Sequence, residues 1–437
     1  MPLDPRLIQE SFALVEESSE KVVGHFYAML FIEDPSLRDM FPPMMDSQRD
    51  RLFGALVRVV HQVHDPGSLV DYLSQLGRDH RKFGVKPEHY ETVGRCLVAA
   101  MKRFARPGWT PAMDESWSAA FGFIADTMIS AAQDAARSTP PFWNGRVVEH
   151  RRPTDSLALI TVEPDHPYPY RPGQYAAIET QRWPRVWRSY SIANAPRPDG
   201  LLTFQVRAID GGWVSSALVH HTRLGDTVRL GPAVGGMVCD AISTRDVLLI
   251  GGGTGIAPLI AIAEDMTRWN TNRQVAVYYG VRRAKDLYAV PQLEALRERA
   301  PWLKIVPCVS HEPAYKGERG MLPDVLTRHG ADRFNWTGHD ICVSGSAAMV
   351  RATLARLTEL EAPSDRIRFD AFAEQTDIFL GHKKQEKTVA TQRKVLSSGE
   401  RLPQRQAPKT GPTPPASPDT SGERQAGRKP PLFSSRP

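Results

Sequence analysis

Cysteine is scarce in this chain. Its 437 residues include four cysteines, and no two of them form a C-x-x-C pair. The four are Cys96, Cys239, Cys308 and Cys342. Such scattered thiols argue against a disulfide framework and against a zinc site built from paired cysteines. They fit a protein that stays in a reducing compartment.

Long apolar runs are also missing. No stretch reaches the roughly 18 uncharged apolar residues that suggest a membrane-spanning helix. The first residues, Met1-Pro2-Leu3-Asp4-Pro5, lack the basic, apolar and small-residue regions of a secretory signal. The sequence therefore predicts a cytoplasmic protein without a transmembrane segment.

An excess of positive charge is absent from most of the chain, although the formal net charge is +6. From Gly381 onward there are twelve Lys or Arg and four Asp or Glu, a contribution of +8, so the rest carries 6 − 8 = −2. The basic character belongs to this last segment, and we expect no nucleic-acid partner. Because residues 381–437 also contain nine prolines, we predict a disordered, basic, Pro-rich tail.

The first 137 residues show the pattern of helices. Apolar residues recur at helical spacing in the stretches 22–30, 52–63, 93–104 and 117–128. Proline and glycine clusters separate these stretches. Without further information this pattern predicts a generic helical bundle.

The remainder divides into two patterns after a predicted linker at 138–145. Residues 146–240 hold short strand-like runs with turn residues between them, which is typical of a small antiparallel barrel. In residues 241–380 strands alternate with helices, which predicts a parallel sheet covered on both faces. The fold class is therefore multidomain: all-α, then antiparallel β, then α/β.

A chemically distinctive stretch runs from Arg185 to Asn194 and reads as a strand. Residues two apart share a face of a strand, so Arg188 and Tyr190 point the same way while Ser191 points the other way. A guanidinium for a phosphate, a ring for stacking and a hydroxyl suit a flat cofactor that carries a phosphate. The alternative is a hairpin edge with an ordinary Arg–Tyr pair.

Two later stretches favour the cofactor. An apolar strand ends in Gly251-Gly252-Gly253-Thr254-Gly255-Ile256-Ala257-Pro258, and a helical pattern follows at Leu259, Ile262, Ala263 and Met266. Glycines there let backbone N–H groups approach a pyrophosphate. The strand 341–344 likewise ends in a turn of small residues at Ser344 and Gly345. Arg282 and Arg283, after the intervening strand, could meet a 2′-phosphate, but exposed arginines are common and the choice between NADH and NADPH stays open.

Residues 142–380 resemble a reductase module of the ferredoxin–NADP reductase type. Its flavin signature R-x-Y-S and its nicotinamide signature G-G-x-G-x-x-P are both present, and Ser344 stands where the C-G-x-x-x-M signature has cysteine. The resemblance implies that an FAD and a nicotinamide dinucleotide bind here. The residues it assigns to them are Tyr175, Arg188, Ser189, Tyr190, Ser191, Gly212, Val214, Ser215, Gly251, Gly252, Gly253, Thr254, Gly255, Ile256, Pro258, Arg282, Arg283, Ser344, Gly345 and Phe372. For Tyr175 the alternative is a tyrosine of the barrel core.

The helical part resembles the globin of bacterial flavohaemoglobins. The segment around His80 follows H-x-x-F-x-[IV]-K-P-E-x-Y, with H-F-Y near residue 27 and Q-R-x-x-L-F near residue 50. The resemblance implies that His80 is the haem iron ligand and Phe41 packs on the porphyrin. It also implies that Tyr27 and Gln48 donate hydrogen bonds to bound O₂, that Leu52 walls the pocket, and that Tyr90 lies beside the proximal histidine.

Two positions depart from the family. Ala132 stands where a glutamate normally works with Tyr90, and Asp79 stands where a lysine lies next to the haem and the flavin. Both differences bear on the electron density of the proximal imidazole and on the rate of electron transfer. Neither removes the iron ligand.

The combined resemblance covers residues 1–380 and implies three cofactors: haem b, FAD, and NADH or NADPH. It implies a nitric oxide dioxygenase, in which electrons pass from the nicotinamide to FAD to haem, and NO and O₂ become nitrate. The partners are then the two gases, and we expect a monomer. A haem-based gas or redox sensor, and a flavin reductase with another electron acceptor, are the alternatives.

Overall fold

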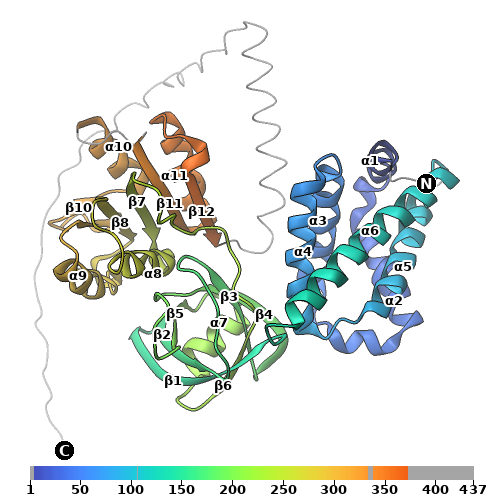
Figure 1. Cartoon of the computed structure of the whole chain (residues 1–437), viewed down its shortest axis with the longest axis horizontal. Helices are drawn as coiled ribbons and strands as arrows, with labels where there is room; N and C mark the ends of the chain where they lie inside the picture. Colours follow the sequence, from blue (N-terminus) through green and yellow to red (C-terminus); the bar gives the residue numbers. More distant parts are fainter. Residues whose placement is uncertain (1–3, 106, 333–337, 373–437) are drawn as a thin grey trace, which may run out of the picture. The chain divides into compact units, whose positions relative to one another are not determined.

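The computed structural model describes residues 4–105, 107–332 and 338–372. The first part of the chain is helical (Figure 1). Its helices are α1 (Pro5–Ala13), η1 (Glu16–Ser18), α2 (Ser19–Glu33), η2 (Pro35–Met40), α3 (Asp46–Gln62), α4 (Pro66–His80), η3 (Arg81–Phe83), α5 (Pro87–Ala105) and α6 (Pro111–Ala136).

Side-chain caps start several of these helices. The side chains of Asp4, Asp34, Asp65 and Thr110 accept hydrogen bonds from backbone N–H groups at the first turns of α1, η2, α4 and α6. Each cap is followed directly by proline, whose missing N–H costs nothing at a helix start. Of the proline and glycine clusters seen in the sequence, those at Pro66 and Pro87 start helices α4 and α5.

The core of the helical part forms around Trp117, which is fully buried. Its indole N–H donates to Ser11 Oγ at 2.7 Å, so the polar atom of the ring is satisfied. Helices α4 and α6 approach closely at Gly77, where an added Cβ would lie 2.2 Å from the Met128 carbonyl oxygen. This contact fixes α4, the helix that ends at His80.

The middle part is an antiparallel sheet in the order β4-β3-β6-β1-β2-β5. Its strands are β1 (Trp143–Thr154), β2 (Leu157–Pro164), β3 (Tyr175–Thr180), β4 (Trp183–Ser191), β5 (Leu202–Arg207) and β6 (Thr227–Leu230), with α7 (Trp213–Ser216) and a π-helical turn (Ala217–His221) between β5 and β6. A bridge between Ile192 and Phe204 links the two end strands, so the sheet curls into a barrel. Residues 143–145 of the expected linker belong to β1, because Trp143 is buried in the barrel core.

The hairpin before the R-x-Y-S segment has an unusual backbone. Arg185 has a φ of 66°, a left-handed conformation that side chains rarely adopt. Its N–H donates to the buried carboxylate of Glu179, which also accepts from Arg229 Nη1 at 3.1 Å. These bonds hold the turn that sets the register of β4 on β3.

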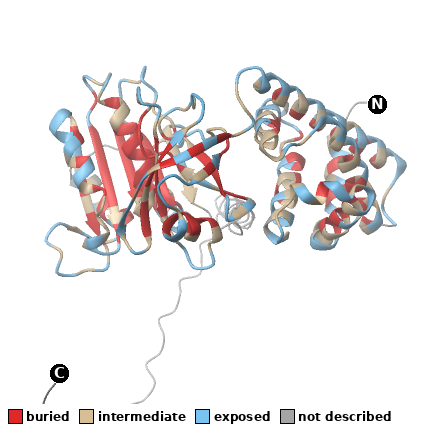
Figure 2. Cartoon of the chain, turned by 90° about the horizontal axis from the view of Figure 1, so that it is seen from below, coloured by how far each residue is buried: buried red, intermediate tan, exposed pale blue. Residues whose placement is uncertain are grey.

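The last part is a parallel sheet in the order β10-β9-β8-β7-β11-β12. Its elements are β7 (Asp246–Gly252), η5 (Gly253–Gly255), α8 (Ile256–Met266), β8 (Val275–Val281), η6 (Ala284–Asp286), α9 (Val290–Arg299), β9 (Leu303–Val309), β10 (Glu318–Arg319), α10 (Leu322–Asp332), β11 (His339–Ser346), α11 (Ala347–Glu359), η8 (Ser364–Arg366) and β12 (Ile367–Phe372). Its central strands are buried along their length (Figure 2). One apolar cluster, containing Leu249 and Val277, covers one face, and another, containing Leu248 and Tyr278, covers the other.

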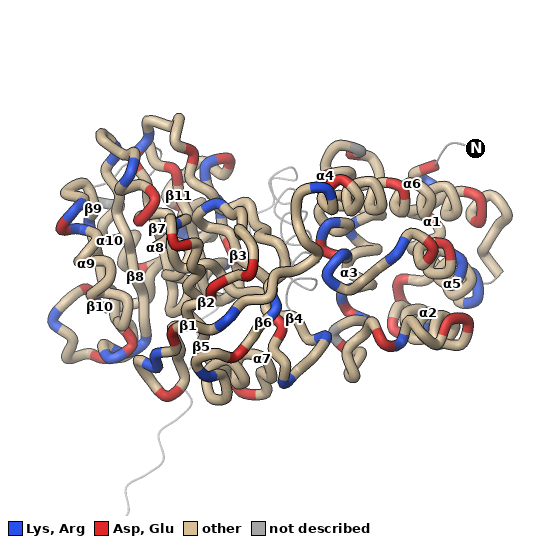
Figure 3. The backbone as a smooth tube through the Cα atoms, turned by 60° about the horizontal axis from the view of Figure 1, so that its bottom comes forward, with Lys and Arg blue, Asp and Glu red and all other residues tan. Residues whose placement is uncertain are grey.

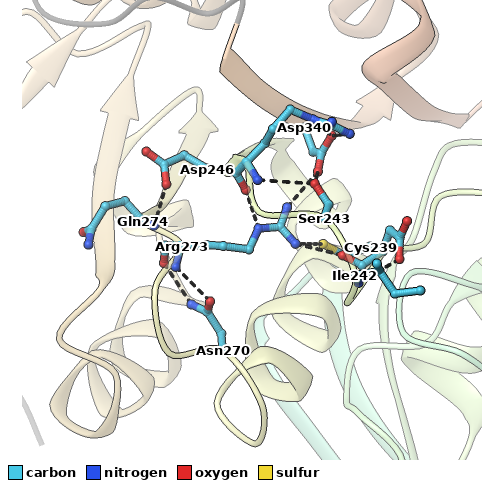
Figure 4. A network of polar contacts seen from close by, with 10 residues as sticks. Cys239, Ile242, Ser243, Asp246, Asn270, Arg273, Gln274 and Asp340 are labelled. Atoms are coloured by element: carbon cyan, nitrogen blue, oxygen red, sulfur yellow. Dashed lines mark hydrogen bonds and ion pairs between the residues drawn. The ribbon is translucent and has the colours of Figure 1, made fainter.

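A buried arginine ties the amino ends of these strands together (Figure 4). The Arg273 side chain is 4% exposed, and its Nη2 lies 2.8 Å from Asp340 Oδ2. Its Nη1 donates to the Asp240 carbonyl at 2.8 Å, while Ser243 Oγ donates to Asp340 at 2.6 Å and Arg245 Nε at 2.9 Å. The network attaches the connection between the barrel and the parallel sheet to the start of β8 and β11.

The predicted fold class is confirmed. In the described chain no helix is both long and apolar enough to cross a membrane. Acidic and basic positions alternate along the helices and strands (Figure 3), in line with the near-neutral charge of this part. The predicted tail at 381–437 lies outside the described residues.

Candidate functional site

His80 is the last residue of α4, and one nitrogen of its ring forms a hydrogen bond. Its Nδ1 lies 2.8 Å from the Leu76 carbonyl oxygen, which can only accept, so Nδ1 carries the hydrogen. Burial lowers the pKa of His80, which favours the neutral imidazole. The lone pair of Nε2 is then available for a metal, and the Leu76 carbonyl fixes the ring orientation.

Tyr27 and Gln48 come together from α2 and α3. The Tyr27 side chain is 4% exposed, and burial raises its pKa to about 12 in spite of the hydrogen bond with Gln48 and the charges of Arg49 and Arg51. The phenol is therefore neutral and can donate a hydrogen bond. The Phe41 ring meets the Tyr27 ring edge-on at 5.5 Å.

Two further contacts define this pocket. Leu52 lies one turn after Gln48 on α3 and packs against the same apolar cluster as Phe41. Arg51 interacts electrostatically with both Tyr27 and Asp79, so this stretch of α3 faces the end of α4. The structure thus brings the predicted distal residues to the side of the helical part where His80 lies.

Tyr90 is half-buried on α5 among Leu69, Leu73 and Met128. Burial raises its pKa, and within the described residues its hydroxyl has no hydrogen-bond partner. The methyl group of Ala132 cannot accept one. It follows that the orientation of His80 comes from the Leu76 carbonyl, and that an action of Tyr90 on the imidazole stays a prediction.

The barrel places Arg188 and its neighbours on β4, paired with β3. In this register Ser191 faces Tyr175, Tyr190 faces Ala176, and Arg188 faces Ile178. The Arg188 guanidinium donates to the Trp187 carbonyl at 2.8 Å and forms no ion pair with any described carboxylate. Since most of its donors are unused, it can bind a phosphate bidentately.

The Gly211-Gly212 loop opens a small pocket. Gly212 precedes α7, and an added Cβ there would lie 2.4 Å from Ser215 Oγ, so the position requires glycine. Ser215 is buried and its Oγ donates to the Gly212 carbonyl at 3.2 Å, while Val214 packs in the barrel core. Beside the loop is a cavity of about 200 Å³, lined in part by Arg182 and His221.

Two tryptophans line the same cavity and escaped the sequence analysis. The rings of Trp183 and Trp213 stack with centroids 4.8 Å apart and an interplanar angle of 23°. They come from β4 and α7, which are thirty residues apart, and no local pattern pairs them. The stacked indole rings can pack against an adenine ring, and the neighbouring glycine loop leaves room for a phosphate. The site therefore suits the adenosine end of a dinucleotide.

The glycine cluster after β7 lies at the carboxyl edge of the parallel sheet. Gly253 has a φ of 58°, and Gly255 is so close to β11 that an added Cβ would meet the Ser344 carbonyl oxygen at 2.2 Å. Ile256 and Pro258 are buried at the start of α8, after Thr254. These residues bring the backbone of the loop against Ser344 and Gly345, as expected for a pyrophosphate loop at a strand end.

Ser344 has an unsatisfied hydroxyl. Its Oγ is buried and has no hydrogen-bond partner in the described residues, although buried polar atoms are normally paired. In register it lies between Gly251 of β7 and Asp370 of β12. A ligand group at this edge would satisfy the hydroxyl. Arg282 and Arg283 follow β8 at the same edge, exposed and without a described carboxylate partner.

Asp370 is the functional candidate that sequence reasoning missed. Its Oδ2 lies 3.3 Å from Ser191 Oγ, which joins β12 of the parallel sheet to the R-x-Y-S strand. Burial raises the pKa of Asp370 to about 6, although the Ser191 hydroxyl opposes the shift. Phe372, the predicted flavin neighbour, ends the same strand. A carboxyl in a six-residue strand carries no local signal of such a contact.

The raised pKa gives a stability prediction for Asp370→Asn. The folded state holds the Asp370 proton more tightly than the unfolded state, so ionisation destabilises wild type as pH rises from 3.8 through about 6. The amide cannot ionise, and the variant should be more stable than wild type at pH 8 by about 1–2 kcal/mol, a value discounted for partial exposure. Urea unfolding at pH 8 and pH 4 measures the difference, which should vanish at the lower pH. Equal stability of the two proteins at pH 8 would contradict the shift.

Comparison with known proteins finds similarity along most of the chain. Three family models match in succession: "Globin" at residues 24–128, "Oxidoreductase FAD-binding domain" at 147–238, and "Oxidoreductase NAD-binding domain" at 249–355. A "Flavohemoprotein" of Bacillus subtilis is 23% identical over 393 residues, covering 85% of this chain and 97% of that protein. The "Flavohemoprotein" of Bordetella pertussis is 28% identical over 319 residues, covering 68% and 78%.

A solved structure shows the same fold over most of the chain. The flavohemoglobin of Malassezia yamatoensis, with bound FAD and heme, superposes with a TM-score of 0.68 at 17% identity and covers 84% of this chain and 99% of its own. At this identity the likeness concerns the fold. In the described residues no cluster of three or more His, Cys, Asp or Glu forms a separate metal site.

Proposed function

Since the chain is a flavohaemoprotein, a globin followed by FAD-binding and NAD-binding oxidoreductase domains, we propose that it is an NAD(P)H-dependent nitric oxide dioxygenase that converts NO and O₂ to nitrate. Its cofactors are haem, FAD and a nicotinamide dinucleotide. The observation that carries the proposal is a donor pair, Tyr27 and Gln48, in the same globin as a histidine whose Nε2 is free. A pure electron-transfer haem has no need of such donors.

The residues present fit the three groups. His80 offers Nε2, Arg188 offers an unpaired guanidinium, and Ser344 offers a buried hydroxyl without a partner. In the protein without cofactors each of these groups lacks a hydrogen-bond or coordination partner. A bound cofactor would supply that partner. When bound, haem and FAD supply the one-electron and oxygen chemistry that amino-acid side chains lack.

On the distal side, the chain contributes hydrogen-bond donors. The neutral Tyr27 phenol, oriented by Gln48, donates to a diatomic ligand that gains negative charge. Phe41 and Leu52 surround these donors with apolar groups and keep water out, which strengthens the hydrogen bonds. On the proximal side, His80 holds the metal as a neutral ligand.

On the reductase side, the chain binds and orients two dinucleotides. We assign Arg188, Gly212, Val214 and Ser215 to the FAD phosphates and Tyr175, Tyr190 and Phe372 to its ring. The loop at 251–258, together with Ser344 and Gly345, takes the nicotinamide dinucleotide. If Arg282 and Arg283 bind a 2′-phosphate, wild type should prefer NADPH to NADH, and the double alanine variant should lose that preference.

The proposal is tested in a stopped-flow instrument with haem- and FAD-loaded protein. NADH or NADPH, O₂ and NO are mixed with the protein, and NO consumption and nitrate are measured. We expect nitrate to form in proportion to NO consumed. Reduction of the flavin by NADH without nitrate formation would reject the proposal.

A second function has one observation in its favour. Tyr90 has no carboxylate partner in the described residues, because Ala132 stands where the resemblance implies a glutamate. If Tyr90 acts on His80, the proximal imidazole is then less electron-rich than with that glutamate. A weaker proximal ligand suits a haem-based gas sensor more than a fast oxygenase. In that case NO and O₂ bind, but the same experiment yields little nitrate.

Tyr27→Phe tests the distal donor directly. Loss of a hydrogen bond to a partly charged ligand should raise the O₂ dissociation rate roughly ten- to hundredfold. Flash photolysis or stopped-flow displacement by CO measures that rate. Tyr72→Phe on α4, whose ring covers Arg58 at 4.1 Å, is the matched control and should leave it unchanged. An unchanged rate in Tyr27→Phe would mean that this hydroxyl does not reach the ligand.

A further inference from the structure

Three aromatic rings follow one another from the globin to the barrel. The His80 and Phe83 rings meet edge-on with centroids 6.0 Å apart. Phe83 in turn meets Trp187 of β4 edge-on at 6.3 Å. Trp187 is 5% exposed and directly precedes Arg188 in the segment assigned to FAD. The series thus begins at the candidate iron ligand and ends in the strand of the candidate flavin site, on the face that carries Ser189 and Ser191.

A buried cation lies over the last two rings of this series, Phe83 and Trp187. Lys82 Nζ is 5.0 Å from the centroid of Phe83 and 5.2 Å from that of Trp187. Its side chain is 5% exposed, and its ammonium is paired with Asp79, which directly precedes His80. An ammonium above two aromatic faces is attracted to both, and more strongly when it is desolvated.

The barrel accommodates this lysine. An added Cβ on Gly231 would lie 3.3 Å from Lys82 Cδ, so the aliphatic stem runs along the backbone after β6. The arrangement is costly, because the ammonium of Lys82 leaves water to form it while the Asp79 side chain stays 31% exposed. An apolar side chain of equal size could be buried here at a lower cost in free energy. The positive charge, or the ring arrangement that it stabilises, therefore has a function.

We propose that Phe83 and Trp187, clamped by the Asp79–Lys82 pair, are positioning residues that form the electron path from the flavin to the haem. The two rings fill the space between the candidate flavin and haem sites with packed side chains in place of water. The clamp fixes the end of α4, and therefore His80, against β4. In the family a lysine occupies position 79, whereas in this chain the cation comes from Lys82 on the next turn.

The inference rests on the proposed flow of electrons from nicotinamide through FAD to haem. One hydride carries two electrons and a proton. The reduced flavin gives up the electrons singly, each converting one ferric haem to ferrous, and the proton is released to water. The rings of Phe83 and Trp187 are neither oxidised nor reduced overall.

The decisive experiment follows a single turnover of the haem- and FAD-loaded protein. Oxidised protein is mixed with excess NADH under CO without O₂, and flavin bleaching and the Soret band of the ferrous CO form are recorded. Trp187→Leu should slow haem reduction roughly tenfold or more relative to wild type, with flavin bleaching unchanged. Phe83→Leu should act in the same direction, and Trp187→Phe, which keeps a ring, should restore most of the rate.

A second readout does not depend on turnover. Lys82→Met removes a positive charge near the iron and leaves Asp79 unpaired, so the haem midpoint potential, measured by dye titration, should become more negative. Trp187→Leu keeps all charges and should leave this potential unchanged. Trp269→Leu, which removes a tryptophan that covers the parallel sheet, is the matched control and should change neither quantity.

The outcomes separate this inference from the proposed function. Absence of haem reduction in wild type, with the flavin bleached, overturns the proposed electron flow itself. Wild-type reduction with an equally fast Trp187→Leu overturns the path alone. A slow Trp187→Phe together with a slow Trp187→Leu also overturns it, because the loss would then come from packing and not from the ring.

Discussion

His80→Ala is expected to lose the haem Soret band completely. The imidazole has the geometry of an iron ligand, because Nδ1 is bound to the Leu76 carbonyl and Nε2 is free. The visible spectrum of the variant purified with added haem measures the loss. Because the reductase elements fold around their own cores, FAD content and NADH–ferricyanide activity should stay at wild-type levels.

Two further variants serve as controls for this result. Arg188→Ala is the reciprocal change and should lower FAD occupancy while the Soret band persists. His61→Ala, an exposed histidine of α3, should change neither cofactor. A Soret band that survives in His80→Ala at full intensity would show that another residue binds the iron.

Arg273→Met should destabilise the protein by about 3 kcal/mol, because Asp340 keeps only the more exposed Arg245 as a charged partner and the Asp240 carbonyl loses its donor. Asp340 is 3% exposed and accepts from Ser243, Arg245 and Arg273. Urea unfolding followed by far-UV circular dichroism measures the loss. Arg268→Met at the end of α8, where the ion pair is exposed, is the matched control and should cost no more than about 0.5 kcal/mol.

The network also predicts a dependence on pH. Burial alone raises the pKa of Asp340, but the hydrogen bonds from Ser243 and Arg245 and the charges of Arg245 and Arg273 outweigh burial and hold the pKa below its ordinary value. Asp340 therefore stabilises the fold above the unfolded-state pKa of about 3.8, and this contribution is lost as pH falls through the lowered value. The gap between Arg273→Met and wild type should narrow in acid. A constant gap down to pH 3 would contradict the assignment.

The sequence predicted the parts of the molecule that depend on local pattern. His80, Arg188 and the glycine cluster at 251–255 lie inside short motifs whose backbone geometry follows from neighbouring residues. The cap at Asp65 belongs to an Asp-Pro-Gly cluster, which marks a boundary between helices for the same reason. The three fold classes followed from the periods of the apolar residues.

The rest depends on contacts between distant segments. Asp370 reaches Ser191 across 179 positions of the chain, and Trp183 stacks on Trp213 from another element. Lys82 lies in a stretch rich in charged residues, yet its side chain is buried against Trp187. No pattern in a single sequence shows which strands and helices become neighbours. These contacts can therefore be identified only in the folded structure.

Ser344 gives the nicotinamide edge a particular chemical character. Unlike a cysteine thiol, the serine hydroxyl at this position is not oxidised to sulfenic, sulfinic or sulfonic acid. It also does not react with mild alkylating reagents. The sulfur of the same strand, Cys342, is 2% exposed inside the sheet, two residues away. Treatment with peroxide or iodoacetamide should therefore leave hydride transfer intact, a tolerance that relatives with a thiol at this edge would not share.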